Sequence, residues 1–558
     1  MDQQTSQPMR STADLAASLD LPADAVVPYG RNKAKLDHRL ASESGGRAKV
    51  VLVTAVNPTP FGEGKTVHTI GLSMALCRLG ERAVPTLRQP SMGPIFGTKG
   101  GGTGGGGSQL RPSDEINLHL TGDFHAVAAA NNLLAAAVDT SLLLDNPHKL
   151  DPERISWRRV VDVNDRALRQ IRTGLGGPKN GIPRDTGFDI TSASEVMAIL
   201  ALSTDLADLR ARLGRIQVGV DYSGRSVTAE DLGCAGAMAA VMRDALDPTL
   251  VQTSDGTPAL VHAGPFANIA HGNCSVIADR IAARFADFVV TEAGFGADMG
   301  AEKYVHVKHP VSGLTPDVAV VVTTVRAMKV HSGDFKARVK GKPAPELERV
   351  DPEAVERGCA NLEAHLENLT RFGMPAVVAI NRFPTDDPSE LDRIRERARA
   401  AGAAAVVDSE VFARGSEGGL DLAEAVREVA CSGSSRIDPV YTPEMRPLEK
   451  LEALARTVYG ANAVSLSAEA AEQLGAIEAQ GFGELPLCMA KTQYSLSHDP
   501  KLRGRPRDFE FPVREIRVQA GAGFLVPIAG AMQTMPGMGR TPSYRQIDID
   551  SNGGITGL

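Results

Sequence analysis

A short run of residues early in the chain has the composition of a phosphate-binding loop. Between a continuous apolar segment and an amphipathic segment over 67–79 lies Thr59-Pro60-Phe61-Gly62-Glu63-Gly64-Lys65-Thr66. Successive backbone N–H groups in such a loop bind phosphate oxygens, and the helix that follows adds partial positive charge at its N-terminus. Lys65 would contact the outer phosphates, and the Thr66 hydroxyl would coordinate Mg²⁺. The usual pattern has a glycine where Thr59 stands, so a simple strand–helix turn that contains Gly-Lys-Thr is the alternative.

Two later segments also carry residues that could contact anions or protons. Arg88 precedes a glycine tract over 97–108, and glycine lets the backbone approach an anionic ligand closely. The tract therefore predicts a second anion-binding loop, with a flexible linker as the equally weighted alternative. Asp123 and His125 lie two positions apart, a pairing that is more often structural than catalytic.

The elements that would position these residues alternate between strands and helices. Apolar runs bounded by turn residues predict buried strands, over 48–56, 288–291, 317–325, 375–380 and 404–407. Periodic apolar patterns predict helices, over 194–202, 232–244, 352–372 and 388–401. This alternation is typical of an α/β fold with a mostly parallel sheet. We expect a large P-loop-type domain over 1–360 and two smaller α/β domains, over 361–480 and 481–558, the first of which contributes to a ligand site.

Composition excludes several classes of protein. A length of 558 residues corresponds to about three or four domains. Lys plus Arg is 60 and Asp plus Glu is 67, so the net charge is 60 − 67 = −7, which excludes a globally basic nucleic-acid binder. The six cysteines have no metal or redox spacing, which favours a reducing compartment. The chain begins without a signal-like segment and contains no run of eighteen apolar residues, so we expect a cytoplasmic protein without a membrane span.

A series of collinear motifs over about 11–558 resembles the formate–tetrahydrofolate ligase family. They are T-P-F-G-E-G-K-T, L-R-Q-P-S-M-G-P-I-F-G-T-K-G-G, D-E-I-N-L-H-L-T-G-D-F-H-A, G-F-D-I-T-S-A-S-E-V-M-A-I-L, G-P-F-A-N-I-A-H-G, V-T-E-A-G-F-G-A-D-M-G-A-E-K, I-N-R-F-P-T-D and L-P-L-C-M-A-K-T-Q-Y-S. The resemblance implies ATP-dependent ligation of formate to tetrahydrofolate through formyl phosphate, giving 10-formyltetrahydrofolate, ADP and phosphate. It also implies a homotetramer and stimulation by a monovalent cation.

The resemblance also implies roles for individual residues. Lys65 and Arg88 would be catalytic, with the run 59–66 binding ATP and Thr66 binding Mg²⁺. The folate site would be formed by Asp123, Gln89 and three aromatic side chains, Phe295, Phe383 and Phe412. In a chain with 4% aromatic residues, phenylalanines in polar loops are conspicuous as stacking faces for a pterin.

Three positions depart from the family pattern. Gln89 stands where Glu is usual, Phe412 where Trp is common and Gly107 where Tyr is often found. None of these departures removes a residue that handles phosphate, so we expect the activity to be retained with weaker folate binding.

Two other hypotheses share the phosphate loop. One is an ATP-dependent carboxylate ligase similar to dethiobiotin synthetase, a family of much shorter chains. The other is a non-catalytic nucleotide switch of the ParA or MinD kind. Phosphate release that depends on both formate and tetrahydrofolate would distinguish the ligase from a switch.

Overall fold

The centre of the molecule is a twelve-stranded sheet. The computed structural model describes residues 8–42, 48–99, 101–266, 269–339, 342–530 and 532–558. The strand order is β1 (Val26–Pro28), β2 (Ala34–Leu36), β14 (Thr249–Thr253), β15 (Pro258–Val261), β4 (Ala83–Leu87), β16 (Phe288–Glu292), β3 (Lys49–Ala55), β17 (Val318–Thr323), β20 (Ala376–Asn381) and β21 (Ala405–Ser409). From β15 to β21 neighbouring strands are parallel, and the other end of the sheet is antiparallel. A hairpin of β5 (Gly104–Gly105) and β6 (Ser108–Arg111) joins at β14.

Helices cover both faces of the parallel part of the sheet, which explains why its strands are apolar throughout. Val51 and Val53 of β3 pack with residues of α2 (Lys65–Arg78) and α16 (Leu420–Cys431). Leu52, between them, faces the opposite way and packs in the cluster that contains α12 (Val325–His331), α13 (Pro352–Arg371) and α14 (Pro388–Ala400). Because side chains alternate along a strand, a strand buried on both faces needs apolar residues at every position.

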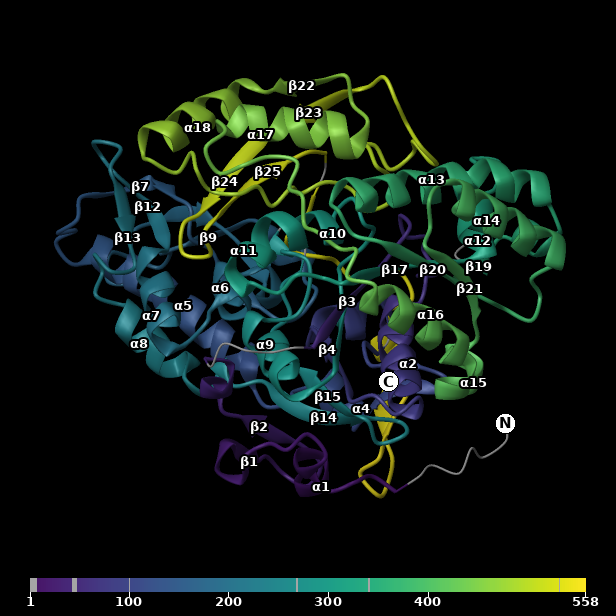
Figure 1. Ribbon diagram of the computed structural model, residues 1–558. Helices are drawn as coiled ribbons and strands as arrows, with labels where there is room; N and C mark the ends of the chain where they lie inside the picture. The colour runs from purple at the N-terminus through teal and green to yellow at the C-terminus, as the bar shows by residue number, and fades with distance from the viewer. Residues whose placement is uncertain (1–7, 43–47, 100, 267–268, 340–341, 531) are drawn as a thin grey trace.

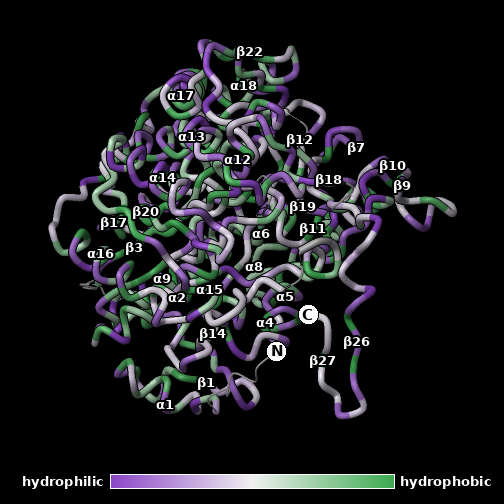
Figure 2. Tube along the Cα trace, turned by 90° about the vertical axis from the view of Figure 1, so that its right-hand side faces the viewer, coloured by the Kyte–Doolittle hydropathy of each residue, from purple (hydrophilic) through white to green (hydrophobic). Residues whose placement is uncertain are grey.

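Smaller elements are packed around the central sheet (Figure 1). One group, shown in blue and teal, contains β7 (Leu150–Ile155), β8 (Arg159–Val161), β9 (Ile171–Thr173), β10 (Arg184–Thr186), β11 (Phe188–Ile190), β12 (Gln217–Asp221), β13 (Ser226–Thr228), α5 (Asp123–Leu143), α6 (Glu195–Leu202), α7 (Leu206–Arg215), α8 (Ala235–Met242) and α9 (Val276–Phe285). The C-terminal group lies at the top of the view and contains α17 (Pro447–Leu454), α18 (Ala468–Ala479), β22 (Ala463–Leu466), β23 (Glu510–Val513), β24 (Glu515–Gln519) and β25 (Phe524–Ile528). A last hairpin of β26 (Asp548–Ile549) and β27 (Ile555–Thr556) projects from the body (Figure 2).

The predicted α/β class with a mostly parallel sheet is confirmed. The predicted strands and helices are present with ends that differ by a few residues, the largest difference being α8 at Ala235–Met242 against a prediction of 232–244. Strand β4 was not predicted because Pro85 lies in its middle, and Pro is usually confined to edge strands. The domain boundaries stay a prediction, and the central sheet itself continues across residue 360 through β20 and β21.

The C-terminal part of the chain is joined to the main cores. Leu487 and Leu525 belong to the same apolar cluster as Leu52, and Phe524 and Val526 belong to the cluster around α5 and α9. Beyond residue 485 the described residues contain strands and turns without an α-helix, which agrees with the loss of helical periodicity there.

Helix α5 is long and apolar enough, by length and composition alone, to cross a membrane. Its polar side chains, however, bind neighbouring elements of the fold. Asp139 forms ion pairs with Arg159 (2.7 Å) and Arg184 (2.9 Å). The Asn131 amide donates to the Arg158 carbonyl (2.9 Å). These contacts are typical of a helix in the core of a protein.

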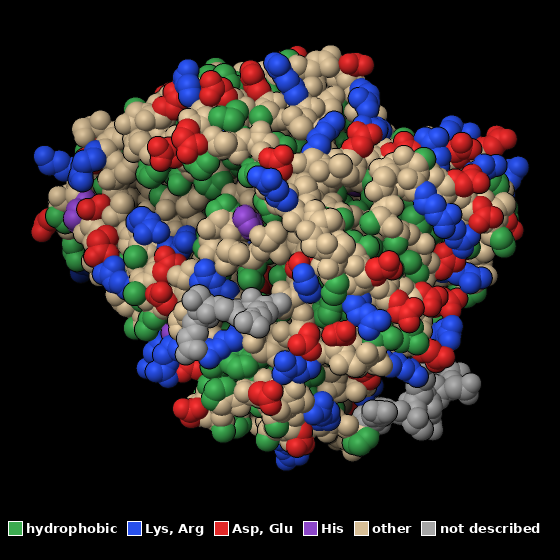
Figure 3. All heavy atoms as spheres, viewed as in Figure 1, with side chains coloured by type: hydrophobic (Ala, Val, Ile, Leu, Met, Phe, Trp, Pro, Cys, Tyr) green, Lys and Arg blue, Asp and Glu red, His purple; other side chains and the backbone are tan. Residues whose placement is uncertain are grey.

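On the face shown in Figure 3, acidic and basic side chains are interspersed over the surface.

A fully buried ion pair fixes the C-terminal segment to the sheet. Lys491 and Asp298 are both inaccessible and lie 2.6 Å apart (Nζ to Oδ2). Removing one partner leaves an uncompensated buried charge. We therefore expect Lys491→Met to destabilise the fold by about 3–5 kcal/mol, measured as a lower urea midpoint. Lys501→Met, at an exposed position nearby, is the control and should change the midpoint little. Equal midpoints for the two variants would contradict the structural role of the pair.

Candidate functional site

The predicted phosphate loop connects β3 to the N-terminus of α2, as the sequence indicated. Gly62 and Gly64 have φ of 74° and 92°, in the left-handed region that favours glycine. Gly64 is the N-cap of α2. A Cβ at Gly64 would lie 2.8 Å from Nδ2 of Asn381, so a side chain at this position would push against Asn381 as well as strain the backbone. The loop passes this close because Asn381 donates a hydrogen bond to the Glu63 carbonyl (3.1 Å).

The Glu63 carboxylate braces the loop from inside. Its Oε1 accepts from the Thr59 backbone N–H (2.7 Å) and its Oε2 from the Thr324 hydroxyl (3.0 Å). With 1% of its surface exposed, Glu63 is turned away from solvent. The carboxylate therefore joins the start of the loop to the end of β17, and the Glu63 side chain is directed into the protein. At the loop's outer side, the Phe61 ring lies under the Arg338 guanidinium (5.6 Å to the ring centroid).

Glu292 joins the phosphate loop to the predicted arginine. One carboxylate oxygen of Glu292 accepts a short hydrogen bond from the Thr66 hydroxyl. The other oxygen accepts from Nη2 of Arg88 (3.2 Å), whose Nη1 donates to the Pro265 carbonyl (3.2 Å). Sequence reasoning did not select Glu292. The signal was present, because Glu292 is the polar residue that ends the apolar strand β16, and ligand sites in α/β sheets form at the carboxyl ends of parallel strands.

A small cavity of about 160 Å³ opens beside this cluster. Thr66, Arg88 and Glu292 line it together with Gln89, and Gly101 and Gly102 of the glycine tract complete one wall. The tract is held in place by hydrogen bonds, including one from the Gly102 N–H to Oδ1 of Asn117 (2.7 Å). The described part of the tract therefore forms an ordered wall of the cavity, which supports the binding-loop alternative over the linker.

Gln89 is a polar side chain without polar partners. It is 2% exposed, and neither its amide nitrogen nor its amide oxygen has a hydrogen-bond partner among the described residues. A buried polar group without a partner costs about 1–3 kcal/mol, and such groups mark positions where a ligand or ordered water completes the network. Because Gln89 lines the cavity, its amide is available to a ligand there.

Lys65 is the first residue of α2 and is half-buried. Burial lowers the pKa of its ammonium group, and the carboxylates of Glu292 and Glu63 oppose this effect. Lys65 forms no ion pair within the described part of the chain. Its charge is therefore available to an anionic ligand that enters between the loop and Glu292.

Besides Gln89, the four other predicted folate contacts lie in different places around the sheet. Asp123 is buried against Lys35 of β2 (2.6 Å), and burial raises the pKa of its carboxyl group. Phe383 follows β20 and lies under the Arg326 guanidinium (4.7 Å to the ring centroid). Asp123 and Phe383 thus belong to opposite ends of the strand order, and their action on one pterin ring stays a prediction.

Phe295 and Phe412 lie beside the cavity's aromatic residue and beside the glycine tract, respectively. Phe295 has a left-handed φ of 60°, unusual for a bulky residue, and its ring is 6.5 Å from that of Phe266, which lines the cavity. Phe412 is 51% exposed and packs beside the glycine tract, where the Gly107 N–H donates to its carbonyl (2.7 Å). Of the five predicted folate contacts, Gln89 lines the cavity and the other four do not, and their shared role stays a prediction.

This site combines a glycine-containing loop at a helix N-terminus with an arginine and a small cavity at the carboxyl edge of a parallel sheet. Such an arrangement is typical of α/β enzymes that bind nucleotides. The family model described as "Formate--tetrahydrofolate ligase" matches residues 1–558. The chain is 54% identical to a protein named formate–tetrahydrofolate ligase from Roseiflexus sp. (strain RS-1), over 99% of this chain and 98% of that one. It is 53% identical to a protein of the same name from Saccharopolyspora erythraea, over 99% of this chain and 97% of that one. The protein of this name from Desulforamulus reducens is 51% identical, over 98% of this chain and 96% of that one. The chain belongs to the formate–tetrahydrofolate ligase family, and it is a ligase.

The left-handed glycine at the N-cap can be tested with a matched pair of variants. Gly64 and Gly80 lie at the two ends of α2 with φ of 92° and 93°, and only Gly64 has a neighbour that a Cβ would meet. Both Ala variants should lose about 1 kcal/mol of stability from backbone strain. We expect only Gly64→Ala to raise the KM for ATP, by about tenfold or more, because the new methyl group would push the loop away from Asn381. Similar KM values in the two variants would contradict this account of the loop.

Proposed function

We propose that this ligase joins formate to tetrahydrofolate at the expense of ATP, through a formyl phosphate intermediate, and releases 10-formyltetrahydrofolate, ADP and phosphate. The observation that carries the proposal is the Glu292 carboxylate, which binds Thr66 of the phosphate loop and Arg88 at once. A phosphate held by the loop and a carboxylate held by the arginine therefore meet in one cavity.

The first step is phosphoryl transfer to formate. Arg88 presents a planar fork that suits a carboxylate or a phosphate, which a lysine would not reproduce. A formate oxygen attacks the γ-phosphorus, the bond from that phosphorus to the bridging oxygen breaks, and ADP leaves with the electron pair. The loop N–H groups and Lys65 stabilise the charge on the transferring group, since this reaction depends mainly on positioning and electrostatics.

The second step transfers the formyl group to nitrogen. Formate itself is a poor electrophile, whereas formyl phosphate carries phosphate as a leaving group. The folate amine attacks the formyl carbon, the carbon–oxygen bond to phosphate breaks, and the amine proton is released. Phe295, Phe383 and Phe412 would supply stacking faces, and Asp123 and Gln89 would supply hydrogen bonds, as the family resemblance implies.

The donor atoms around Thr66 suit Mg²⁺. A threonine hydroxyl and a carboxylate are hard oxygen ligands, and Thr66 and Glu292 place one of each side by side. When bound, the ion would neutralise charge on the phosphates of ATP. The monovalent cation and the homotetramer stay predictions from the resemblance, and the cytoplasmic location stays a prediction from composition.

We expect phosphate release from ATP to require both formate and tetrahydrofolate, and Lys65→Ala to abolish it because the ammonium group no longer stabilises the transferring phosphate. A coupled phosphate assay measures the rate, and circular dichroism confirms that the variant is folded. Phosphate release that is indifferent to the two co-substrates would reject the ligase assignment. Near-normal kcat in the variant would reject the role of Lys65.

The size of the aromatic face at Phe412 should affect folate affinity. About half of the ring is exposed, so a larger ring can be accommodated on the solvent side. We expect Phe412→Trp to lower the Kd for tetrahydrofolate by several-fold, since stacking on a larger face contributes about 0.5–1.5 kcal/mol. Equilibrium binding measures the change, with the Kd for ATP as the control. An unchanged or raised Kd for tetrahydrofolate would contradict a stacking role.

A further inference from the structure

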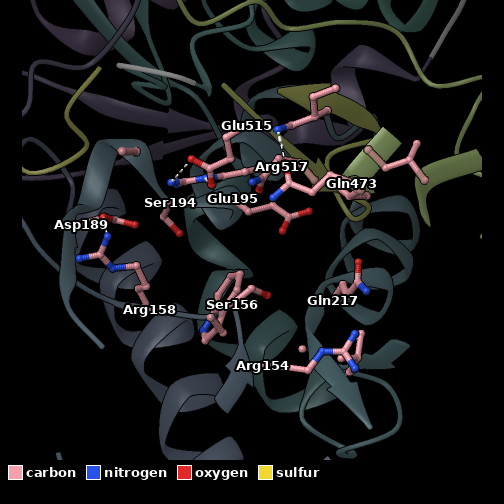
Figure 4. Close-up of a pocket in the computed structure, with 18 of the residues that line it drawn as sticks. Arg154, Ser156, Arg158, Asp189, Ser194, Glu195, Gln217, Gln473, Glu515 and Arg517 are labelled. Carbon is pink, nitrogen blue, oxygen red and sulfur yellow. Dashed lines mark hydrogen bonds and ion pairs between the residues drawn. The ribbon is translucent and has the colours of Figure 1, made fainter. Parts of the chain in front are cut away.

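A second and larger cavity of about 480 Å³ lies away from the phosphate loop (Figure 4). Strands β7 and β12 and the start of α6 form one side, and α18 and β24 of the C-terminal group form the other. Its volume is within the range of small-molecule sites, about 300–1,000 Å³. None of the residues placed in the catalytic machinery above lines this cavity.

Glu195 supplies a buried carboxylate to this cavity. The residue is 6% exposed, and Figure 4 shows its carboxylate pointing into the open centre of the pocket. Oε1 accepts from the backbone N–H groups of Gly521 (2.7 Å) and Ala522 (3.1 Å). Within the described residues, Oε2 has no hydrogen-bond partner. Burial raises the pKa of Glu195 to about 7, although the two N–H groups act in the opposite direction. The carboxylate is therefore poorly solvated, and a hydrogen-bond donor on a ligand would compensate for the missing water.

The walls around Glu195 suit a flat, partly apolar group. Trp157, Val160, Ile477 and Val518 line the cavity, and Nε1 of Trp157 donates to the Asn131 carbonyl (3.0 Å), which fixes the indole. Aromatic and aliphatic walls with one buried acceptor are what an aminoheterocycle requires, because its rings are apolar and its edge carries N–H donors.

Arg158 and Arg517 connect this cavity to a strongly basic groove. Both line the cavity and also a neighbouring groove of about 580 Å³. The groove contains five arginines and no acidic residue in its lining, the others being Arg166, Arg169 and Arg514.

The charges of these arginines are only partly neutralised. Arg158 pairs with Asp189 (3.2 Å) and Arg517 with Glu515 (2.5 Å). Arg166 and Arg169 donate to backbone carbonyls, and the Arg514 side chain has no partner among the described residues. The groove thus keeps a positive excess suited to phosphate oxygens, which arginine binds bidentately.

We propose that the cavity and the groove together form a second ligand site, for a purine nucleotide. The base lies in the cavity with its N–H edge on Glu195, and the phosphate lies between Arg158 and Arg517 and extends toward Arg514. A nucleoside alone would leave the arginines unused, and a simple anion would leave Glu195 and the apolar walls unused. A purine nucleotide satisfies both.

The chain offers a direct reporter for this site, because Trp157 is its single tryptophan. Titration with GMP or AMP in EDTA, which removes Mg²⁺, should change the tryptophan fluorescence saturably. UMP, with its smaller base, should bind more weakly. We expect guanosine to bind with lower affinity than GMP, because it lacks the phosphate that the arginines hold.

Two variants separate the two halves of the site. Glu195→Gln keeps an oxygen for the Gly521 and Ala522 N–H groups and turns a donor into the cavity, so it should weaken GMP and guanosine alike by about tenfold or more. Arg514→Ala should weaken GMP several-fold and leave guanosine unchanged. Arg507→Ala, an exposed arginine outside the groove, is the matched control and should bind GMP normally.

Three results would overturn the proposal. The first is the absence of a saturable response to millimolar GMP or AMP. The second is a response that survives both site variants and is lost in Lys65→Ala, since it would then come from the phosphate loop. The third is equal affinity for UMP, which would remove the purine assignment. Thermal unfolding of each variant, compared with that of the wild type, checks that the variant is folded, so that a loss of binding reports on the site.

Discussion

The bridging carboxylate of Glu292 is the contact on which the arrangement of the active site depends. It ends β16, which lies in the sheet between β4, followed by Arg88, and β3, followed by the phosphate loop. A carboxylate has two oxygens, so one residue in the middle strand can bind a partner from each neighbour. Hydrogen bonds that involve a charged group contribute about 1.5–3 kcal/mol each. The loop and the arginine are therefore held as one unit, and neither can shift without loss at the other.

The same principle, a charge buried with its partner, joins the layers of this aromatic-poor fold. Small aliphatic side chains fill the core around the sheet, and buried lysines form ion pairs with acidic residues of neighbouring elements. Lys308 pairs with Asp279 (2.7 Å) and Lys329 with Glu390 (2.7 Å), in addition to the pair at Lys491. Buried pairs add little net stability compared with apolar residues, but breaking one is costly. We expect them to act mainly by penalising other alignments of the elements that they join.

The sequence was sufficient for features that depend on local pattern and insufficient for those that depend on register. Apolar runs identified β3, β16, β17 and β20 because both faces of these strands are covered. β4 was missed because Pro85 interrupts the pattern, and its place in the sheet is set by pairing with β15 and β16. The phosphate loop was predicted from residue type and spacing, whereas the role of Arg88 was implied by the family resemblance. The role of Glu63 as a brace and of Glu292 as a bridge could not be found in this way, because their partners Thr324 and Arg88 are distant in the chain.

Gln89 shows how a single substitution changes the balance of charge in the cavity. The resemblance places a glutamate at this position, and a second carboxylate beside Glu292 would oppose the entry of formate and of phosphate. A carboxamide removes that repulsion and presents an N–H donor as well as an oxygen acceptor. Because the Gln89 amide is buried and has no protein partner in the described structure, its desolvation is compensated only when a ligand or ordered water pairs with it. On the proposed assignment, the residue therefore favours the occupied state of the site, with Arg88 on one side of the ligand and the amide on the other.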